Sequence, residues 1–88
     1  MTYYEYAGEM QELCFKISQA QKVLEETGLY DFYYATSTGF EELRKKMSVE
    51  EADRPIDKDQ EETLENTSAY LKDVQQQATE KLDQEVTA

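Results

Sequence analysis

Among the side chains of this protein that can take part in chemistry, carboxylates are the most numerous. The 88 residues include twenty Asp and Glu, nine Lys and Arg, and no His. The densest acidic run occupies residues 50–65, in which only Arg54 and Lys58 are basic. Its eight acids are Glu50, Glu51, Asp53, Asp57, Asp59, Glu61, Glu62 and Glu65. Carboxylates of this kind can transfer protons, bind hard cations or present negative charge to a partner.

Proton transfer by a pair of these carboxylates is not favoured by their spacing. Glutamates occur as adjacent pairs at residues 25–26, 41–42, 50–51 and 61–62. Adjacent residues on a helix point about 100° apart, so the two members of a pair do not converge on one substrate atom. The lack of His removes the usual general base, and the single Cys14 has no imidazole to activate it. We therefore expect a protein that is not an enzyme and has no cofactor.

One sequence pattern weakly indicates a metal site. The pattern Asp57-x-Asp59-x-Glu61 resembles the opening of an EF-hand calcium loop. The sixth loop position requires Gly and is Glu62, and the twelfth requires Glu and is Ser68. A zinc site of the Cys/His type is excluded by the lack of His and of a second Cys. The sequence therefore predicts no dedicated metal site.

With proton transfer and metal binding not favoured, the acidic run is left to present negative charge to a partner. The chain has a formal net charge of −11, and from Ser48 onward twelve acids stand against four bases. A field of this sign repels nucleic acid and anionic lipid and attracts basic protein surfaces. We expect a protein partner with a basic surface, itself a nucleic-acid-binding protein, and no direct binding to nucleic acid or membrane.

Helices must position these carboxylates. From Tyr3 to Leu24 the apolar residues recur at spacings of three and four, the a/d pattern of a coiled-coil seam. This stripe predicts a helix over residues 2–27, ended by Thr27-Gly28 because Gly tolerates a left-handed backbone. The stripe consists of Tyr3, Tyr6, Met10, Leu13, Ile17, Ala20 and Leu24.

The middle of the chain is more difficult to assign. Residues 29–36 are rich in aromatic residues, and no second strand-like run exists with which they could pair, so we predict a short helix or packed turn. Residues 36–39 read Thr-Ser-Thr-Gly and predict a break. Thr38 and Glu41 form a capping-box pattern for another short helix. The apolar face of that helix consists of Phe40, Leu43 and Met47.

Two further capping patterns precede the last predicted helix. Ser48 with Glu51 predicts one additional turn, and Asp57 with Gln60 predicts the start of a long helix over residues 58–84. No Gly or Pro interrupts the chain beyond that start. The apolar stripe of this helix is Leu64, Thr67, Leu71, Val74, Ala78 and, displaced by one position, Leu82.

These elements predict a single all-α domain over residues 1–88. We expect the first and last helices to form a long antiparallel helical hairpin, with one or two short helices at one end, giving a small three-helix bundle. Residues 83–88 are expected to form a frayed tail.

A second stripe on the first helix suggests an aromatic surface. Tyr4 and Phe15 lie away from the a/d seam. The aromatic segment can fold back over them, with Gly8 allowing its close approach and Cys14 buried as a small hydrophobic residue. In the other interpretation the aromatic residues stay exposed and bind a partner. The candidate partner-binding aromatics are Tyr4, Phe15, Tyr30, Tyr33 and Tyr34.

The compartment is predicted from two absences. No apolar run approaches the ~20 residues that span a bilayer, and Met1 is not followed by the basic and apolar stretches of a signal peptide. We expect a cytoplasmic protein.

In size, charge and lack of catalytic groups the chain resembles phage-type DNA-mimic inhibitors and anti-CRISPR proteins. The resemblance is compositional, and it implies an inhibitor or antitoxin that blocks a basic nucleic-acid-binding protein by nucleic-acid mimicry. Two alternatives remain. One is a secretion-system chaperone or WXG-like helical hairpin that pairs with another helical chain, although Trp is absent and the turn reads Ser37-Thr38-Gly39. The other is a structural homo-oligomer, such as a homodimer, closed through the heptad stripe.

Overall fold

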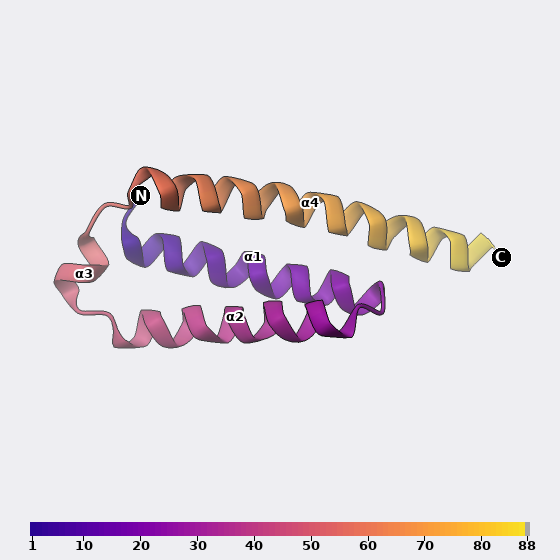
Figure 1. The fold of residues 1–88 in the computed structure, drawn as a ribbon, viewed down its shortest axis with the longest axis horizontal. Coiled ribbons are helices and arrows are strands. Elements are labelled where there is room, and N and C mark those ends of the chain that lie inside the picture. The colour runs from indigo at the N-terminus through magenta and orange to yellow at the C-terminus, as the bar shows by residue number, and fades with distance from the viewer. Residues whose placement is uncertain (88) are drawn as a thin grey trace.

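The computed structural model describes residues 1–87, and these residues fold as four helices joined by short connections (Figure 1). No strand is formed in this part of the chain, where Thr2 and Pro55 make an isolated bridge. The helices are α1 Tyr3–Val23, α2 Thr27–Lys46, α3 Val49–Asp53 and α4 Lys58–Thr87. The all-α fold and the small helical bundle are confirmed.

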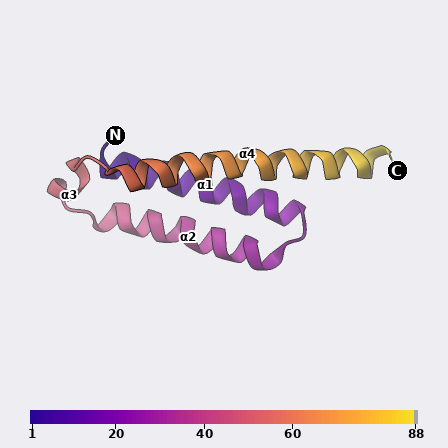
Figure 2. The same cartoon turned by 45° about the horizontal axis from the view of Figure 1, so that its top comes forward.

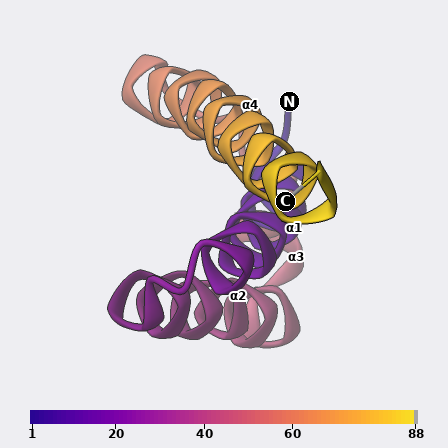
Figure 3. The same cartoon turned by 90° about the vertical axis from the view of Figure 1, so that its right-hand side faces the viewer.

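Helix α1 lies in the centre of the bundle and packs against each of the other helices. Figure 1 shows α2 antiparallel to α1 and α4 parallel to it. In the end-on view of Figure 3, α2 and α4 diverge from α1 in a V. Helix α4 projects beyond the α1–α2 turn (Figure 2), and the molecule measures 54 × 22 × 16 Å.

Helix α1 begins and ends with local capping bonds. Thr2 Oγ1 accepts from Glu5 N at 3.2 Å, and Glu5 Oε1 accepts from Thr2 N at 3.0 Å, which completes a capping box. At the other end, Glu26 N donates to Gln21 O and Glu25 N to Lys22 O. These two bonds form a Schellman motif, with Glu25 in the left-handed region at φ 62°.

The predicted stop at Thr27-Gly28 is therefore wrong. The left-handed residue is Glu25, and Gly28 lies within the first turn of α2 without a positive φ. The Schellman bonds at Glu25 form without a glycine.

The predicted break at residues 36–39 is also wrong, because α2 is one continuous helix. Thr36 and Thr38 donate their hydroxyls to the backbone oxygens one turn earlier, at 2.8 and 3.2 Å. Side-chain bonds of this kind satisfy hydroxyls inside a helix. Ser37 is buried against α1 and donates to Gln11 O at 3.0 Å. Contact with α1 therefore holds this polar segment in a helix.

The continuous α2 decides the direction of α4. Its twenty residues extend about 30 Å and return the chain to the start of α1. From there α4 can run alongside α1 only in the same direction. A long antiparallel hairpin is present, as predicted, but α1 forms it with α2, and α4 is the parallel third helix (Figure 1).

The core consists of two apolar clusters along α1. Of the predicted seam, Tyr3, Leu13 and Leu24 are partly buried and pack against these clusters, and the other four residues are buried, which confirms the stripe. The first cluster is Ile17, Ala20, Leu71, Val74 and Ala78, and the second is Tyr6, Met10 and Cys14. Burial of Cys14 confirms its predicted role as a small hydrophobic residue.

Gln21 is a polar side chain within this core. It is 1% exposed, its Nε2 donates to the hydroxyl of Tyr70 at 2.9 Å, and its Oε1 has no partner. The Tyr70 ring stacks on Tyr33 at 5.8 Å between ring centres, which links α2 to α4. Burial raises the pKa of Tyr33 above its ordinary value.

The end of the chain differs from the prediction in one respect. Helix α4 continues to Thr87 instead of ending at residue 84. Fraying of residues 83–88 stays a prediction, and Ala88 lies outside the described residues.

Candidate partner-binding surfaces

The acidic run of residues 50–65, which we call the acidic end, lies where α1 begins (Figure 1). Tyr3 N donates to Arg54 O at 2.7 Å, and Ile56 N donates to Met1 O at 3.1 Å. The Ile56 side chain packs against the second core cluster. Backbone bonds and apolar packing therefore fix the acidic end relative to α1.

Some of these carboxylates also serve their own helices. Asp57 Oδ1 accepts from Gln60 N at 2.8 Å, and Gln60 Oε1 accepts from Asp57 N at 3.1 Å, so the predicted capping pair is confirmed. Ser48 Oγ accepts from Glu51 N at 3.2 Å, which confirms the predicted cap of α3. An acidic side chain in the first turn of a helix stabilises that helix by roughly 0.3–1 kcal/mol. The first turns of α3 and α4 contain Glu50, Glu51, Asp59 and Glu61.

The charge of the acidic end is not neutralised from within. All eight of its acids are exposed, and within residues 1–87 none forms an ion pair. Its two bases are not ion-paired either, and the Arg54 guanidinium lies over the ring of Tyr3 at 4.8 Å. In contrast, Glu12, Glu25, Glu41 and Glu42 each pair with a lysine. The acidic end therefore presents uncompensated charge to solvent.

The acids of α4 do not lie on one face. Glu61 and Glu65 are four residues apart and share a face, and Glu62 adjoins Glu65 at a spacing of three, whereas Asp59 and Glu61, two apart, lie on nearly opposite sides of α4. The structure therefore brings the eight acids to one end of the molecule without arranging them in a single line.

Two further acids adjoin this surface that the sequence reasoning missed. Glu9 and Glu12 of α1 line the same hollow as Glu65 of α4. Their spacing along the first helix was visible in the sequence. Their position beside Glu65 follows only from the parallel direction of α4, which the sequence did not reveal.

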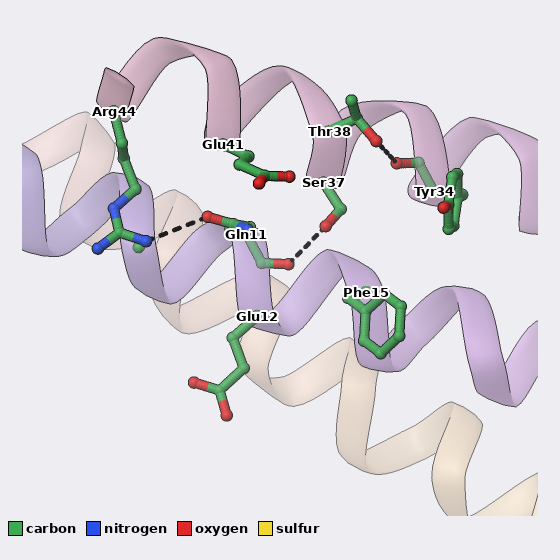
Figure 4. A pocket seen from close by; sticks show the side chains of 9 residues that line it. Gln11, Glu12, Phe15, Tyr34, Ser37, Thr38, Glu41 and Arg44 are labelled. Carbon is green, nitrogen blue, oxygen red and sulfur yellow. Dashed lines mark hydrogen bonds between the residues drawn. The ribbon is translucent and has the colours of Figure 1, made fainter. Parts of the chain in front are cut away.

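The predicted aromatic residues separate into different environments. Tyr4 is 43% exposed, and its ring lies under the guanidinium of Arg44 at 4.6 Å. Phe15 and Tyr34, each 47% exposed, line one hollow between α1 and α2 (Figure 4), and Tyr30 stacks on Tyr34 at 5.8 Å. Tyr33 belongs to the core instead, packed against both clusters. Phe32, outside the predicted set, is 61% exposed.

Gly8 permits a close approach, as predicted, but Arg44 makes it. An added Cβ at Gly8 would lie 3.2 Å from Arg44 Cζ. Arg44 Nη1 donates to Gln11 Oε1 at 3.2 Å, seen in Figure 4, and its buried Nε has no partner. The expectation that the aromatic segment covers Tyr4 and Phe15 is therefore wrong: Arg44 near the end of α2 lies over Tyr4, Tyr34 only lines a hollow with Phe15, and both Tyr4 and Phe15 stay half exposed.

The described residues contain no group of three His, Cys, Asp or Glu side chains that could hold a metal ion. Cys14 is buried, and burial raises the pKa of its thiol above the ordinary value. A thiol of this kind is a poor nucleophile at neutral pH. Within residues 1–87 no helix is both long enough and apolar enough to cross a membrane.

Comparison with known proteins adds nothing to the site. No family model, no curated protein and no solved structure matches the chain. The function must therefore be inferred from the geometry and charge described above.

Proposed function

We propose that this protein is a small acidic regulator that binds the basic surface of a nucleic-acid-binding protein and blocks it by nucleic-acid mimicry. The observation that supports the proposal is the acidic end, where eight exposed carboxylates have no ion-pair partner among the described residues and where backbone bonds join the segment to the start of α1. We place this activity in the cytoplasm, the compartment expected from the sequence.

The spacing of the carboxylates suits such a role. Four acids occur from Asp59 to Glu65, a length of about 9 Å at ~1.5 Å rise per residue. This gives one charge about every 2–3 Å, against one phosphate charge about every 1.7 Å along duplex DNA. Because these acids do not all lie on one face of α4, a basic groove that binds phosphates would meet about three of the four charges from one side of this helix.

The two alternatives depend on an apolar seam that is free to pair with another chain. Within α1 the seam residues Tyr6, Met10, Ile17 and Ala20 are buried by the protein's own helices. A homo-oligomer or a chaperone-type pairing would therefore have to use another surface, which makes both weaker candidates than the acidic end.

The proposal can be tested with a quadruple variant in which Glu50, Glu51, Glu61 and Glu62 are changed to Gln. Affinity capture from the native host at low salt identifies the partner, and the capture is repeated at high salt. We expect wild type to lose the partner as salt increases and the variant to bind it weakly at any salt, because long-range attraction supplies the binding. Wild type should also displace labelled DNA or RNA from the partner.

A matched control variant also loses four negative charges, so its net charge equals that of the quadruple variant. Its changes lie at the other end of the molecule. It changes Glu26, Glu80 and Glu85 to Gln and Asp31 to Asn, all of them exposed. We expect this control to bind like wild type, or nearly so. Undiminished binding by the first variant, or binding that survives molar salt, would show that the acidic end is only a solvated surface.

A further inference from the structure

A groove runs along the α1–α4 interface, and none of its lining residues belongs to α2. It contains two hollows, of about 540 and about 460 Å³, and Lys16 lines both. Leu13 and Leu64 give the first hollow an apolar floor. Ala20 and Ala78 do the same in the second. The groove is therefore apolar at its base along much of α1.

Two rows of side chains follow the first hollow, one on each helix. Within each row the residues are spaced by four, three and four, which places them on one face of their helix. The α1 row is Glu5, Glu9, Glu12 and Lys16, and the α4 row is Glu61, Glu65, Ser68 and Lys72. Because the helices run parallel (Figure 1), Glu9 and Glu12 of α1 line the first hollow together with Glu65 of α4, and Lys16 and Lys72 line it as well.

Most of this charge is unused within the chain. Glu12 pairs with Lys16 at 3.0 Å, whereas Glu9, Glu65 and Lys72 form no ion pair with any residue that the structure describes. Acids that line up across two parallel helices repel one another. A cationic partner at that end of the groove would relieve the repulsion, and its apolar side chains would cover the floor.

We propose that this groove binds one amphipathic, basic helix of the partner protein. The inference rests on the proposed function and names the element of the partner that is recognised. Leu13 and Ala20 lie seven residues apart, about 10 Å along α1, so apolar residues seven apart on a partner helix reach both hollows. Basic residues of the same helix lie against Glu9 and Glu65. Docking of a helix into a groove between two helices reproduces the packing of a helical bundle.

A second copy of this chain fits the groove less well. Each copy carries a net charge of −11, and the lining of the first hollow contains three acids, Glu9, Glu12 and Glu65, against Lys16 and Lys72. Two such grooves placed face to face would repel each other even when antiparallel. Charge complementarity therefore favours a basic partner helix.

Two synthetic peptides of about 20 residues, long enough for a helix of ~30 Å, serve as probes. Both contain the same leucines, lysines and alanines. In the first the leucines recur at spacings of three and four, and in the second they are spread around the helix. We expect the first to bind wild type about tenfold more tightly or better, a difference of ~1.4 kcal/mol. Backbone amide NMR signals of Leu13, Lys16, Leu64 and Lys72 should shift on binding.

A variant pair tests the groove independently. Ser68→Trp fills the first hollow, whose wall contains the half-buried Ser68. Asn66→Trp adds the same ring at an exposed position on another face of α4. We expect the first change to weaken binding of the seam-spaced peptide about tenfold, the equivalent of ~1.4 kcal/mol, and the second to leave it unchanged. Circular dichroism checks that both variants keep their helices.

The outcomes separate the two proposals. Equal binding of both peptides, with NMR shifts confined to residues 50–62, overturns the groove and leaves the acidic end as the site. Failure of both peptides to bind at low salt overturns the groove and counts against the proposed function. A wild-type dimer in sedimentation that Ser68→Trp dissociates would assign the groove to a second copy and overturn the partner helix.

Discussion

Helices α2 and α4 both pack on α1, but by different means. The buried residue that α2 contributes is Ser37, which donates to the backbone oxygen of Gln11, while its partly buried Tyr33 and Phe40 pack against the edge of the core. Arg44 of the same helix donates to the Gln11 side chain and covers Gly8. Helix α4 instead buries apolar side chains, with Leu71 and its neighbours packed against Ile17.

The two kinds of contact contribute differently to the stability of the fold and to the placement of its helices. Burial of apolar area is non-directional and contributes roughly in proportion to the area removed from water. A hydrogen bond contributes only about 1 kcal/mol net, but it fixes distance and orientation. We therefore expect the α1–α4 contact to supply most of the stability and the α1–α2 contact to set how closely α2 approaches.

The largest effect should come from the apolar contact. Ile17 is fully buried between α1 and α4, so Ile17→Ala should lower the free energy of unfolding by about 2–5 kcal/mol. Phe15→Ala is the control on the neighbouring, half-exposed surface and should cost about 1 kcal/mol or less. Urea denaturation of the two variants measures both values. Equal losses would mean that Phe15 contributes to the core as much as Ile17.

The polar contact should respond to added bulk more than to the loss of a bond. Ser37→Leu must push α2 away from the backbone at Gln11 and should cost about 1–3 kcal/mol. Ser37→Ala loses one hydrogen bond and should cost about 1 kcal/mol or less. If Ser37→Leu instead stabilised the protein in thermal denaturation, α2 would not be packed closely at this point.

The same comparison explains which parts of the fold the sequence predicts. The sequence predicts the α1 stripe because the spacing of apolar residues along one helix is a local signal. Residues 36–39 of α2 carry local break signals, and contacts with α1 override them. The α2 residues that contact α1 mix polar Ser37 and Arg44 with partly buried Tyr33 and Phe40, so no continuous apolar stripe marks the pairing of α2 with α1.

The candidate site shows the same division. The exposure of residues 50–65 follows from composition, because charged side chains remain solvated. That Glu9 lies beside Glu65 depends on the direction of α4, which in turn depends on α2 being one helix. Because the sequence wrongly predicts a break in α2, it does not predict that α4 runs parallel to α1, and so it cannot place the α4 side of the groove beside α1.

Gln21 is the exception in the apolar contact, and it sharpens the comparison. Tyr70→Phe removes the partner of its buried amide and should lower the free energy of unfolding by about 1–2 kcal/mol. The double change Gln21→Met with Tyr70→Phe removes both groups and should recover that loss. Chemical denaturation of both variants decides the point. A double variant less stable than Tyr70→Phe would mean that the amide contributes through contacts other than Tyr70.

The smallest effect concerns the turn that lets α2 return along α1. Glu25 holds a left-handed backbone, φ 62°, at the position where helices favour Gly. Glu25→Gly relieves that strain and loses only the ion pair of the exposed Glu25 carboxylate with the partly buried Lys81 at 3.7 Å, so the net gain in unfolding free energy should be about 0.5 kcal/mol. Glu25→Ala is the control, because it loses the same ion pair but keeps the strain, and it should be the less stable variant in thermal melts. If both substitutions lowered the melting temperature equally, the ion pair would outweigh the backbone, and the α1–α2 turn would depend on α4 for its stability.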